Sequence, residues 1–141
     1  TYEENIRTKI CTAAGYRNKD WYVECFKANP NCTWVFGIDG LPHQSHIYRK
    51  NQKGEELFDI MVEGVKHLNN PPIWQYIVFN YNENNIEEAK ELALKHGVNL
   101  ELNISARWDK DDDPYKPKNE KYAKTHYLLR VYIPFYIVVN K

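Results

Sequence analysis

Residues 74–105 read WQYIVFNYNENNIEEAKELALKHGVNLELNIS, and this stretch decides the fold. It opens with a short, mostly apolar run that is typical of a strand. Asn84 and Glu87 then resemble a capping box, and apolar residues recur at helical spacing up to Gly97, the expected left-handed cap. From Val98 onward apolar and polar residues alternate, which indicates a second strand. The stretch therefore predicts two parallel strands joined by a crossover helix.

The same order of elements extends toward the N-terminus. Alternation or apolar runs predict strands over residues 6–12 and 33–39. Helical spacing with possible caps and breakers predicts helices over residues 18–29 and 55–68. The chain is thus predicted to be an α/β protein with about four parallel strands.

The polar side of the fourth predicted strand helps to choose between a sheet covered on both faces and a barrel. Asn99, Glu101 and Asn103 alternate with apolar residues. In a sheet covered on both faces this side would be apolar, whereas in a barrel it can point into a polar interior. We therefore expect residues 1–108 to form a partial (β/α) TIM-like barrel with its helices outside. Residues 109–141, a charged loop and an aromatic, apolar tail, are expected to add an edge strand or a hairpin.

Composition excludes several classes of protein. The 141 residues carry 19 basic and 19 acidic side chains, so the chain lacks the broad basic field of a nucleic-acid partner. No apolar run is long enough to span a membrane, which predicts no membrane partner. Cys11, Cys25 and Cys32 match neither a zinc nor an iron–sulfur spacing and indicate a reduced, cytoplasmic protein. Because the chain begins at Thr1 and its one methionine is Met61, it is interpreted as a processed chain or an interior piece.

Polar residues at the predicted strand ends form the candidate site, because parallel barrels carry their reactive groups there. No nucleophile–base pair and no cluster of His or Cys occurs among them, so neither a catalytic residue nor a metal site is assigned. Such a set suits a polar, zwitterionic cofactor, since Arg can grip a carboxylate and Asp can accept ribose hydroxyls. The candidate binding residues are Thr12, Gly37, Asp39, Asn80, Asn103 and Arg107.

Several of these residues also have a purely structural interpretation. Asp39 either contacts a ribose or closes a turn with Gly40, and Arg107 either pairs with a carboxylate or stacks on Trp108. Arg49, in the long loop, is interpreted as one half of a surface salt bridge.

The remaining polar candidates have two interpretations as well. Asn80 either binds a ligand or helps to start the next helix, and Asn103 faces either a lumen or water. The His43–His46 pair and the acidic residues of 109–113 lack the partners of a metal site and are interpreted as solvated loops.

An ordered series of motifs resembles the middle of a radical S-adenosylmethionine (radical SAM) enzyme. The series is VFGIDGL at 35–41, Tyr48-Arg49, the strand and helix of 74–97, and SARW at 105–108, with KICTAAGYR at 9–17 resembling the preceding strand. It is similar to phage and bacterial members of the family. The resemblance implies a β/α barrel, a [4Fe–4S] cluster on a CxxxCxxC loop, and S-adenosylmethionine bound to the cluster through its amino and carboxylate groups.

The chain departs from the family pattern in ways that shape the functional expectation. CxxxCxxC and the Gly-Gly-Glu segment are absent, Ala13-Ala14 stand for Thr-Asn, and Gly37 stands for a Ser. We therefore expect the central portion of such an enzyme, inactive alone, with S-adenosylmethionine and the cluster held only by the longer parent. Its substrate is unknown, and self-association through exposed barrel edges is expected. The alternatives are a non-catalytic binding or interaction module, and an aldolase-like barrel, which the lack of a strand-end Lys disfavours.

Overall fold

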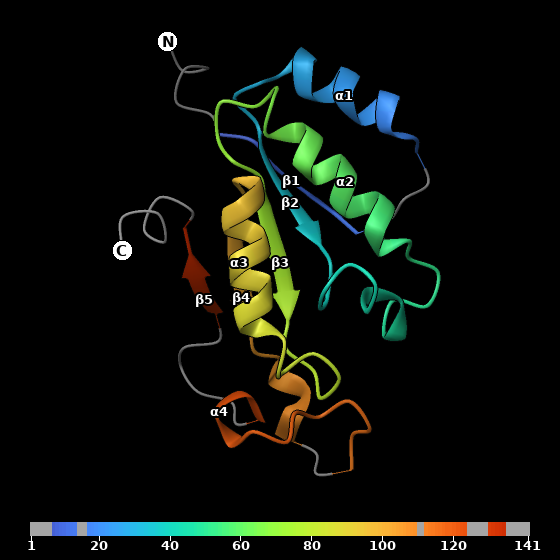
Figure 1. Ribbon diagram of the computed structural model, residues 1–141, viewed down its shortest axis with the longest axis vertical. Coiled ribbons are helices and arrows are strands. Elements are labelled where there is room, and N and C mark those ends of the chain that lie inside the picture. The colour runs from blue at the N-terminus through green and yellow to red at the C-terminus, as the bar shows by residue number, and fades with distance from the viewer. Residues whose placement is uncertain (1–6, 14–16, 110–111, 124–129, 135–141) are drawn as a thin grey trace.

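The computed structural model describes residues 7–13, 17–109, 112–123 and 130–134. Its strands form one sheet in the order β1-β2-β3-β4-β5 (Figure 1). The first four strands run parallel, and β5 lies antiparallel beside β4. The strands are β1 (Lys9–Thr12), β2 (Thr33–Gly37), β3 (Ile73–Ile77), β4 (Asn99–Asn103) and β5 (Arg130–Ile133).

Three main helices connect the parallel strands and lie on the same side of the sheet (Figure 1). Because each crossover returns on that side, the strand order follows the sequence and does not reverse as in a doubly wound sheet. The helices are α1 (Lys19–Ala28), α2 (Gly54–Gly64), α3 (Ile86–His96) and the short α4 (Glu120–Ala123), with 3-10 turns η2 (Ser45–Ile47) and η3 (Ala106–Asp109).

The hydrophobic core fills the space between the helices and this face of the sheet. Phe36, Trp74 and Leu100 form one row across β2, β3 and β4 and are all buried. Phe26 of α1 packs edge-to-face on Trp34, with ring centroids 5.1 Å apart. Burying aromatic rings of this size contributes about 1.5–3 kcal/mol each, so this layer stabilises the whole helix-covered face.

The opposite face of the sheet carries a different set of side chains. In register, Gly37, Gln75, Glu101 and Tyr132 form one row across it, and Ile77 pairs with Asn103 in the next. None of α1, α2 and α3 packs on this side, yet Glu101 is only 3% exposed. The polar alternation in the fourth strand therefore marks a face of the sheet that the three helices leave uncovered.

Most predicted elements are confirmed, with two corrections at helix ends. Asn18 caps α1 by accepting a hydrogen bond from Trp21 N, and Gly97 ends α3 at φ 73°. The expected capping box at the start of α3 is wrong, because the N-cap is Asn85 and its side-chain oxygen accepts from Gln44 instead. The second predicted helix ends early, at Gly64, and tighter turns continue to Leu68.

The broad architecture agrees with the prediction, and the tail contributes an edge strand to the same sheet. Four parallel strands are confirmed, but β1 and β5 do not pair, so the described strands form an open sheet and not a closed barrel. Within the tail, residues 110–111, 124–129 and 135–141 lie outside the described residues. No helix among the described residues is both long and apolar enough to cross a membrane.

Candidate functional site

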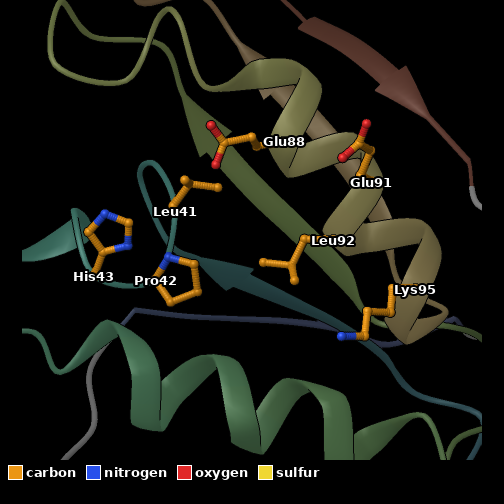
Figure 2. A pocket seen from close by; sticks show the side chains of 7 residues that line it. All are labelled: Leu41, Pro42, His43, Glu88, Glu91, Leu92 and Lys95. Atoms are coloured by element: carbon orange, nitrogen blue, oxygen red, sulfur yellow. The ribbon is translucent and has the colours of Figure 1, made fainter.

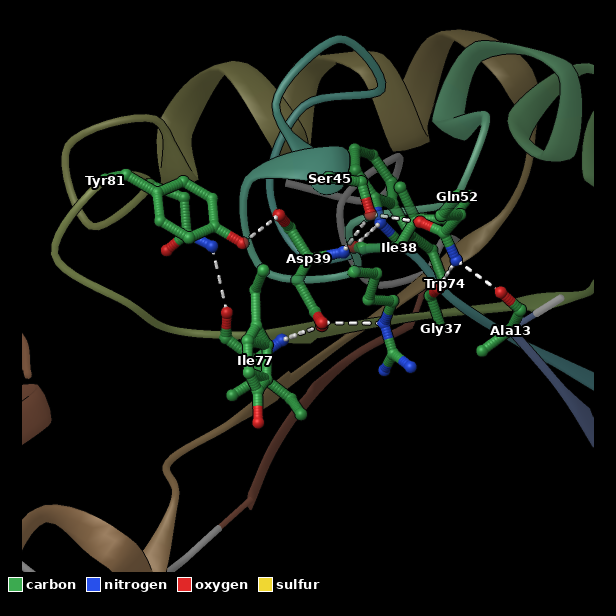
Figure 3. Close-up of polar contacts among 12 residues, drawn as sticks. Ala13, Gly37, Ile38, Asp39, Ser45, Gln52, Trp74, Ile77 and Tyr81 are labelled. Atoms are coloured by element: carbon green, nitrogen blue, oxygen red, sulfur yellow. Dashed lines mark hydrogen bonds and ion pairs between the residues drawn. The ribbon is translucent and has the colours of Figure 1, made fainter. Parts of the chain in front are cut away.

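Asp39 follows β2 and lies at the centre of a polar network at the carboxyl ends of the strands (Figure 3). Its side chain is 0% exposed. One carboxylate oxygen accepts the backbone N–H of Ile77 at 3.1 Å, and the other accepts Nε–H of Arg49 at 2.8 Å. Burial raises the pKa of Asp39 above its ordinary value, while the charge of Arg49 and the N–H of Ile77 oppose that rise.

The loop that carries Arg49 is held by hydrogen bonds to strand ends. Ser45 Oγ accepts the backbone N–H of Asp39 at 3.0 Å and donates to the side-chain oxygen of Gln52. Gln52 Nε2 in turn donates to the carbonyls of Ala13 and Gly37, at 2.6 and 2.8 Å. These bonds join the loop after β2 to the ends of β1 and β2, so the position of Arg49 follows from the sheet.

The tip of Arg49 reaches over Gly37 onto the opposite face of the sheet. A Cβ on Gly37 would lie 2.9 Å from Nη2 of Arg49, so any larger residue here would require the guanidinium to shift. Arg49 is 28% exposed, and neither Nη1 nor Nη2 has an acceptor among the described residues. The guanidinium therefore presents these two donors at the carboxyl edge, the geometry that grips a carboxylate or phosphate.

Asn103 supplies a second group to the same edge. It ends β4 and pairs with Ile77, whose backbone N–H is bound to Asp39. Its Oδ1 is buried and has no hydrogen-bond partner among the described residues. A buried acceptor left without a donor costs about 1–3 kcal/mol, so a bound molecule with an N–H or O–H group would satisfy it. We call Gly37, Arg49, Ile77 and Asn103, with Asp39 behind them, the strand-end site.

Arg107 lies in a neighbouring cluster and is already engaged. Its Nε and Nη2 each lie 2.7 Å from Asp113 Oδ2, and Nη1 donates to Tyr48 Oη at 2.9 Å. Its guanidinium also lies over the rings of Tyr48 and Trp108, so the stacking on Trp108 that the sequence offered as one interpretation is present. Asp113 raises the pKa of Arg107, which keeps its positive charge. Arg107 therefore supports Tyr48, the residue before Arg49.

The structure separates the remaining predicted residues from the strand-end site. The Thr12 hydroxyl lies 3.4 Å from Tyr22 Oη of α1, on the helix-covered face. Asn80 donates through its side chain to the carbonyl of Pro114 and through its backbone to Tyr115. Of the six predicted residues, Gly37 and Asp39 lie at the Arg49 guanidinium, and Asn103 lies beside Ile77 at the end of β4.

The prediction that Arg49 is one half of a surface salt bridge is wrong, because its partner is the fully buried Asp39. A carboxylate at the end of a buried strand needs a counter-charge, because an unpaired buried charge is costly. Arg49 is the first Arg or Lys after Asp39, which was a usable signal. The sequence does not show that the Arg49 side chain turns back onto the strand end.

A separate groove of about 330 Å³ lies on the helix side of the molecule. Figure 2 shows its two walls, one from the loop after β2 and one from α3. Its charged groups are exposed and its floor is apolar, so it contains no buried polar group that calls for a ligand. The lining residues are Leu41, Pro42, His43, Glu88, Glu91, Leu92 and Lys95.

The cysteines do not fit an iron–sulfur cluster. Cys11 is exposed in β1, Cys25 is half-buried in α1, and Cys32 is buried before β2. Among the described residues no three His, Cys, Asp or Glu side chains come together as metal ligands.

Comparison with known proteins adds no relative. No protein-family model, curated protein or solved structure matches the chain. The resemblance to radical SAM enzymes thus stays a prediction from the residues.

Proposed function

We propose that this chain forms the S-adenosylmethionine-binding central portion of a radical SAM enzyme, and that the strand-end site takes the carboxylate of the methionine moiety. The observation that carries the proposal is the Arg49 guanidinium at the carboxyl edge of a parallel sheet. A fully buried Asp39 fixes it, and its two terminal nitrogens have no acceptor among the described residues. A zwitterionic ligand matches the site, because Arg49 offers donors and Asn103 Oδ1 offers a buried acceptor.

A partial barrel is the architecture that goes with this function. The strands follow one another in sequence order, the main helices lie on one side, and polar groups line the other side. These features support a β/α barrel segment with its interior on the polar face. In this proposal the cluster ligands come from residues beyond the 141 of the chain, and the free thiols are in keeping with a reducing, cytoplasmic compartment.

When bound, S-adenosylmethionine would supply the radical chemistry of the parent enzyme. The role of this chain is then to bind and orient. Arg49 holds the carboxylate, Asp39 fixes Arg49, and Gly37 leaves the space for its tip. Because the Arg49 guanidinium lies at the end of β2 and Asn103 ends β4, the ligand would lie across β3.

The proposal is tested by titrating the full chain with S-adenosylmethionine and, separately, with 5′-methylthioadenosine, which lacks the amino-acid carboxylate. NMR signals of Gly37, Arg49 and Asn103 should shift with the first ligand and much less with the second. Arg49→Gln should weaken S-adenosylmethionine binding about tenfold or more, since a hydrogen bond to a charged group contributes about 1.5–3 kcal/mol. Gly37→Ala should act in the same direction, because its Cβ displaces the guanidinium.

Arg17→Gln is the matched control, because Arg17 is exposed and lies over Trp21 at the start of α1. Equal shifts with both ligands, or binding unaffected by Arg49→Gln, would overturn the assignment.

The alternative of a non-catalytic α/β module is favoured by the scattered cysteines. A longer parent chain that binds no iron and sulfide on anaerobic reconstitution would support that alternative.

A further inference from the structure

Residues 112–119 form a strap that lies against the loop between β3 and α3, beyond the carboxyl ends of the strands (Figure 1). The strap has little regular structure and precedes the short helix α4. What holds it is therefore a set of particular side chains on the loop between β3 and α3, and not a ladder of backbone bonds.

Glu83 is the main attachment. It lies in the β3–α3 loop and is 9% exposed. Its two carboxylate oxygens accept the backbone N–H groups of Lys118 and Asn119, at 2.7 and 2.9 Å. A carboxylate that accepts two neighbouring N–H groups makes strong, directional bonds, so Glu83 fixes the end of the strap in both position and orientation.

Asn80 holds the middle of the strap from the same loop. Its side-chain amide donates to the carbonyl of Pro114 at 2.7 Å, and its backbone N–H donates to that of Tyr115 at 3.0 Å. The Tyr115 ring packs against Tyr48, with centroids 5.4 Å apart. Two points of attachment thus align the strap along the ends of the strands.

The strap connects to the strand-end site through Asp113. One oxygen of Asp113 accepts the N–H of Tyr115, which sets its orientation, and the other accepts from Arg107. Arg107 in turn donates to Tyr48 Oη. Tyr48 immediately precedes Arg49, so hydrogen bonds and two short stretches of chain, 113–118 and 48–49, link Glu83 to the strand-end site.

We propose that Glu83 is a positioning residue for the strand-end site: it fixes the strap, and through Asp113, Arg107 and Tyr48 the strap holds Arg49 in its ligand-gripping orientation. The inference rests on the proposed function for the identity of the ligand. The attachment of the strap is a property of the ligand-free chain and is measured separately.

The experiment compares Glu83→Gln with Glu87→Gln in the full chain. Glutamine keeps the shape of Glu83 but places an NH₂ group against one of the two backbone donors. Glu87 is the control, since it lies in the first turn of α3 and its side chain is 82% exposed. Amide hydrogen exchange of Lys118 and Asn119 should accelerate about tenfold or more in Glu83→Gln and stay unchanged in Glu87→Gln. The Arg107 Nε–H signal should broaden or vanish only in Glu83→Gln.

Binding separates positioning from a merely structural role. Glu83→Gln should lower affinity for S-adenosylmethionine more than for 5′-methylthioadenosine, because it disturbs the guanidinium and not the remaining surface. Asp113→Asn should reproduce that loss, and the double variant should lose no more than the larger single effect, since both act along one series of contacts.

Each outcome decides a separate point. Unchanged exchange at Lys118 and Asn119 would overturn the attachment of the strap. Faster exchange with unchanged selectivity for S-adenosylmethionine would overturn positioning and leave the proposed function intact. If the wild-type chain binds neither ligand, the proposed function fails, and the Arg49 Nε–H signal decides the inference: it should broaden in Glu83→Gln and stay unchanged in Glu87→Gln. Should Glu83→Gln not fold, Asn80→Ala, which removes only the exposed bond to Pro114, tests the same strap.

Discussion

At the scale of single residues, Asp39 and Arg49 depend on each other. Asp39 is fully buried, and its charge is matched by one guanidinium nitrogen and one backbone N–H. Breaking such a pair from one side leaves the other partner poorly solvated. The pair therefore joins the loop to the sheet, and in the proposed function it also presents Arg49 to the ligand.

Asp39→Asn should destabilise the protein by roughly 1–3 kcal/mol, because the new NH₂ group faces a donor, Ile77 N–H or Arg49 Nε–H, whichever way the amide turns. Urea unfolding at neutral pH measures the difference. Asp59→Asn is the control, since Asp59 pairs with Lys19 on the surface and is 67% exposed, and such pairs contribute about 0–1 kcal/mol. Equal losses in the two variants would show that burial of Asp39 has no energetic weight.

Because the pKa of Asp39 is raised in the folded protein, its contribution to stability should fall as the pH rises. Its folded pKa lies above the ordinary value of 3.8, chiefly because of burial. Folding therefore favours the protonated carboxyl. The resulting contribution to the free energy of unfolding is fully present below the ordinary pKa and is lost as the pH rises through the folded pKa. The advantage of the wild type over Asp39→Asn in unfolding free energy should thus shrink over that window and then level off. Urea unfolding between about pH 3 and pH 7 tests this, and an advantage that grows with pH would mean that Arg49 outweighs burial.

At the scale of elements, local signals predict a helix well when its cap is local. Asn18 caps α1 and Gly97 ends α3 as the sequence indicates. The prediction for the start of α3 is wrong, because Asn85 bonds to Gln44, which is 41 residues away in sequence. The side chain of Asn82 is hydrogen-bonded elsewhere as well: its Oδ1 accepts the N–H of Phe79, and its Nδ2 donates to the carbonyl of Ile77. Tertiary contacts thus replace the expected capping box.

Gly97→Ala should destabilise the protein by about 1 kcal/mol, because the left-handed conformation at φ 73° is costly for a residue with a Cβ. Space is not the reason, since a Cβ at this position would lie 3.6 Å from its nearest neighbour, Val65 Cγ1. Gly97→Asn should cost less, as Asn tolerates this conformation. Thermal or urea unfolding of the two variants tests the order, and the reverse order would contradict the conformational explanation.

At the scale of the whole molecule, the sheet has an edge strand that could pair with a second chain. Among the described strands β1 pairs only with β2, and its residue Ile10 is 37% exposed. Open parallel edges with apolar side chains promote association between chains. Self-association, which the sequence also led us to expect, is therefore a prediction for this surface.

Ile10→Lys should shift the chain toward the monomer, because a charged side chain at an edge strand opposes pairing with a second copy. Sedimentation velocity over a range of concentrations measures the shift. Leu94→Lys is the control, because Leu94 has a similar exposure, 36%, but lies on α3. A wild-type chain that sediments as a monomer at every concentration would contradict the prediction of self-association.

The sequence by itself determined the order of strands and helices, the parallel pairing that crossover helices imply, and the polar face of β4. These follow from periodicity and from connection length, which are local properties of the chain. Only the tertiary structure decided that Arg49 turns back over Gly37 to Asp39, that Thr12 lies under α1, and that Glu83 holds the strap. The physical reason is that a buried charge or an unpaired N–H takes whichever partner folding brings within reach, and that partner is set by packing and not by distance along the sequence.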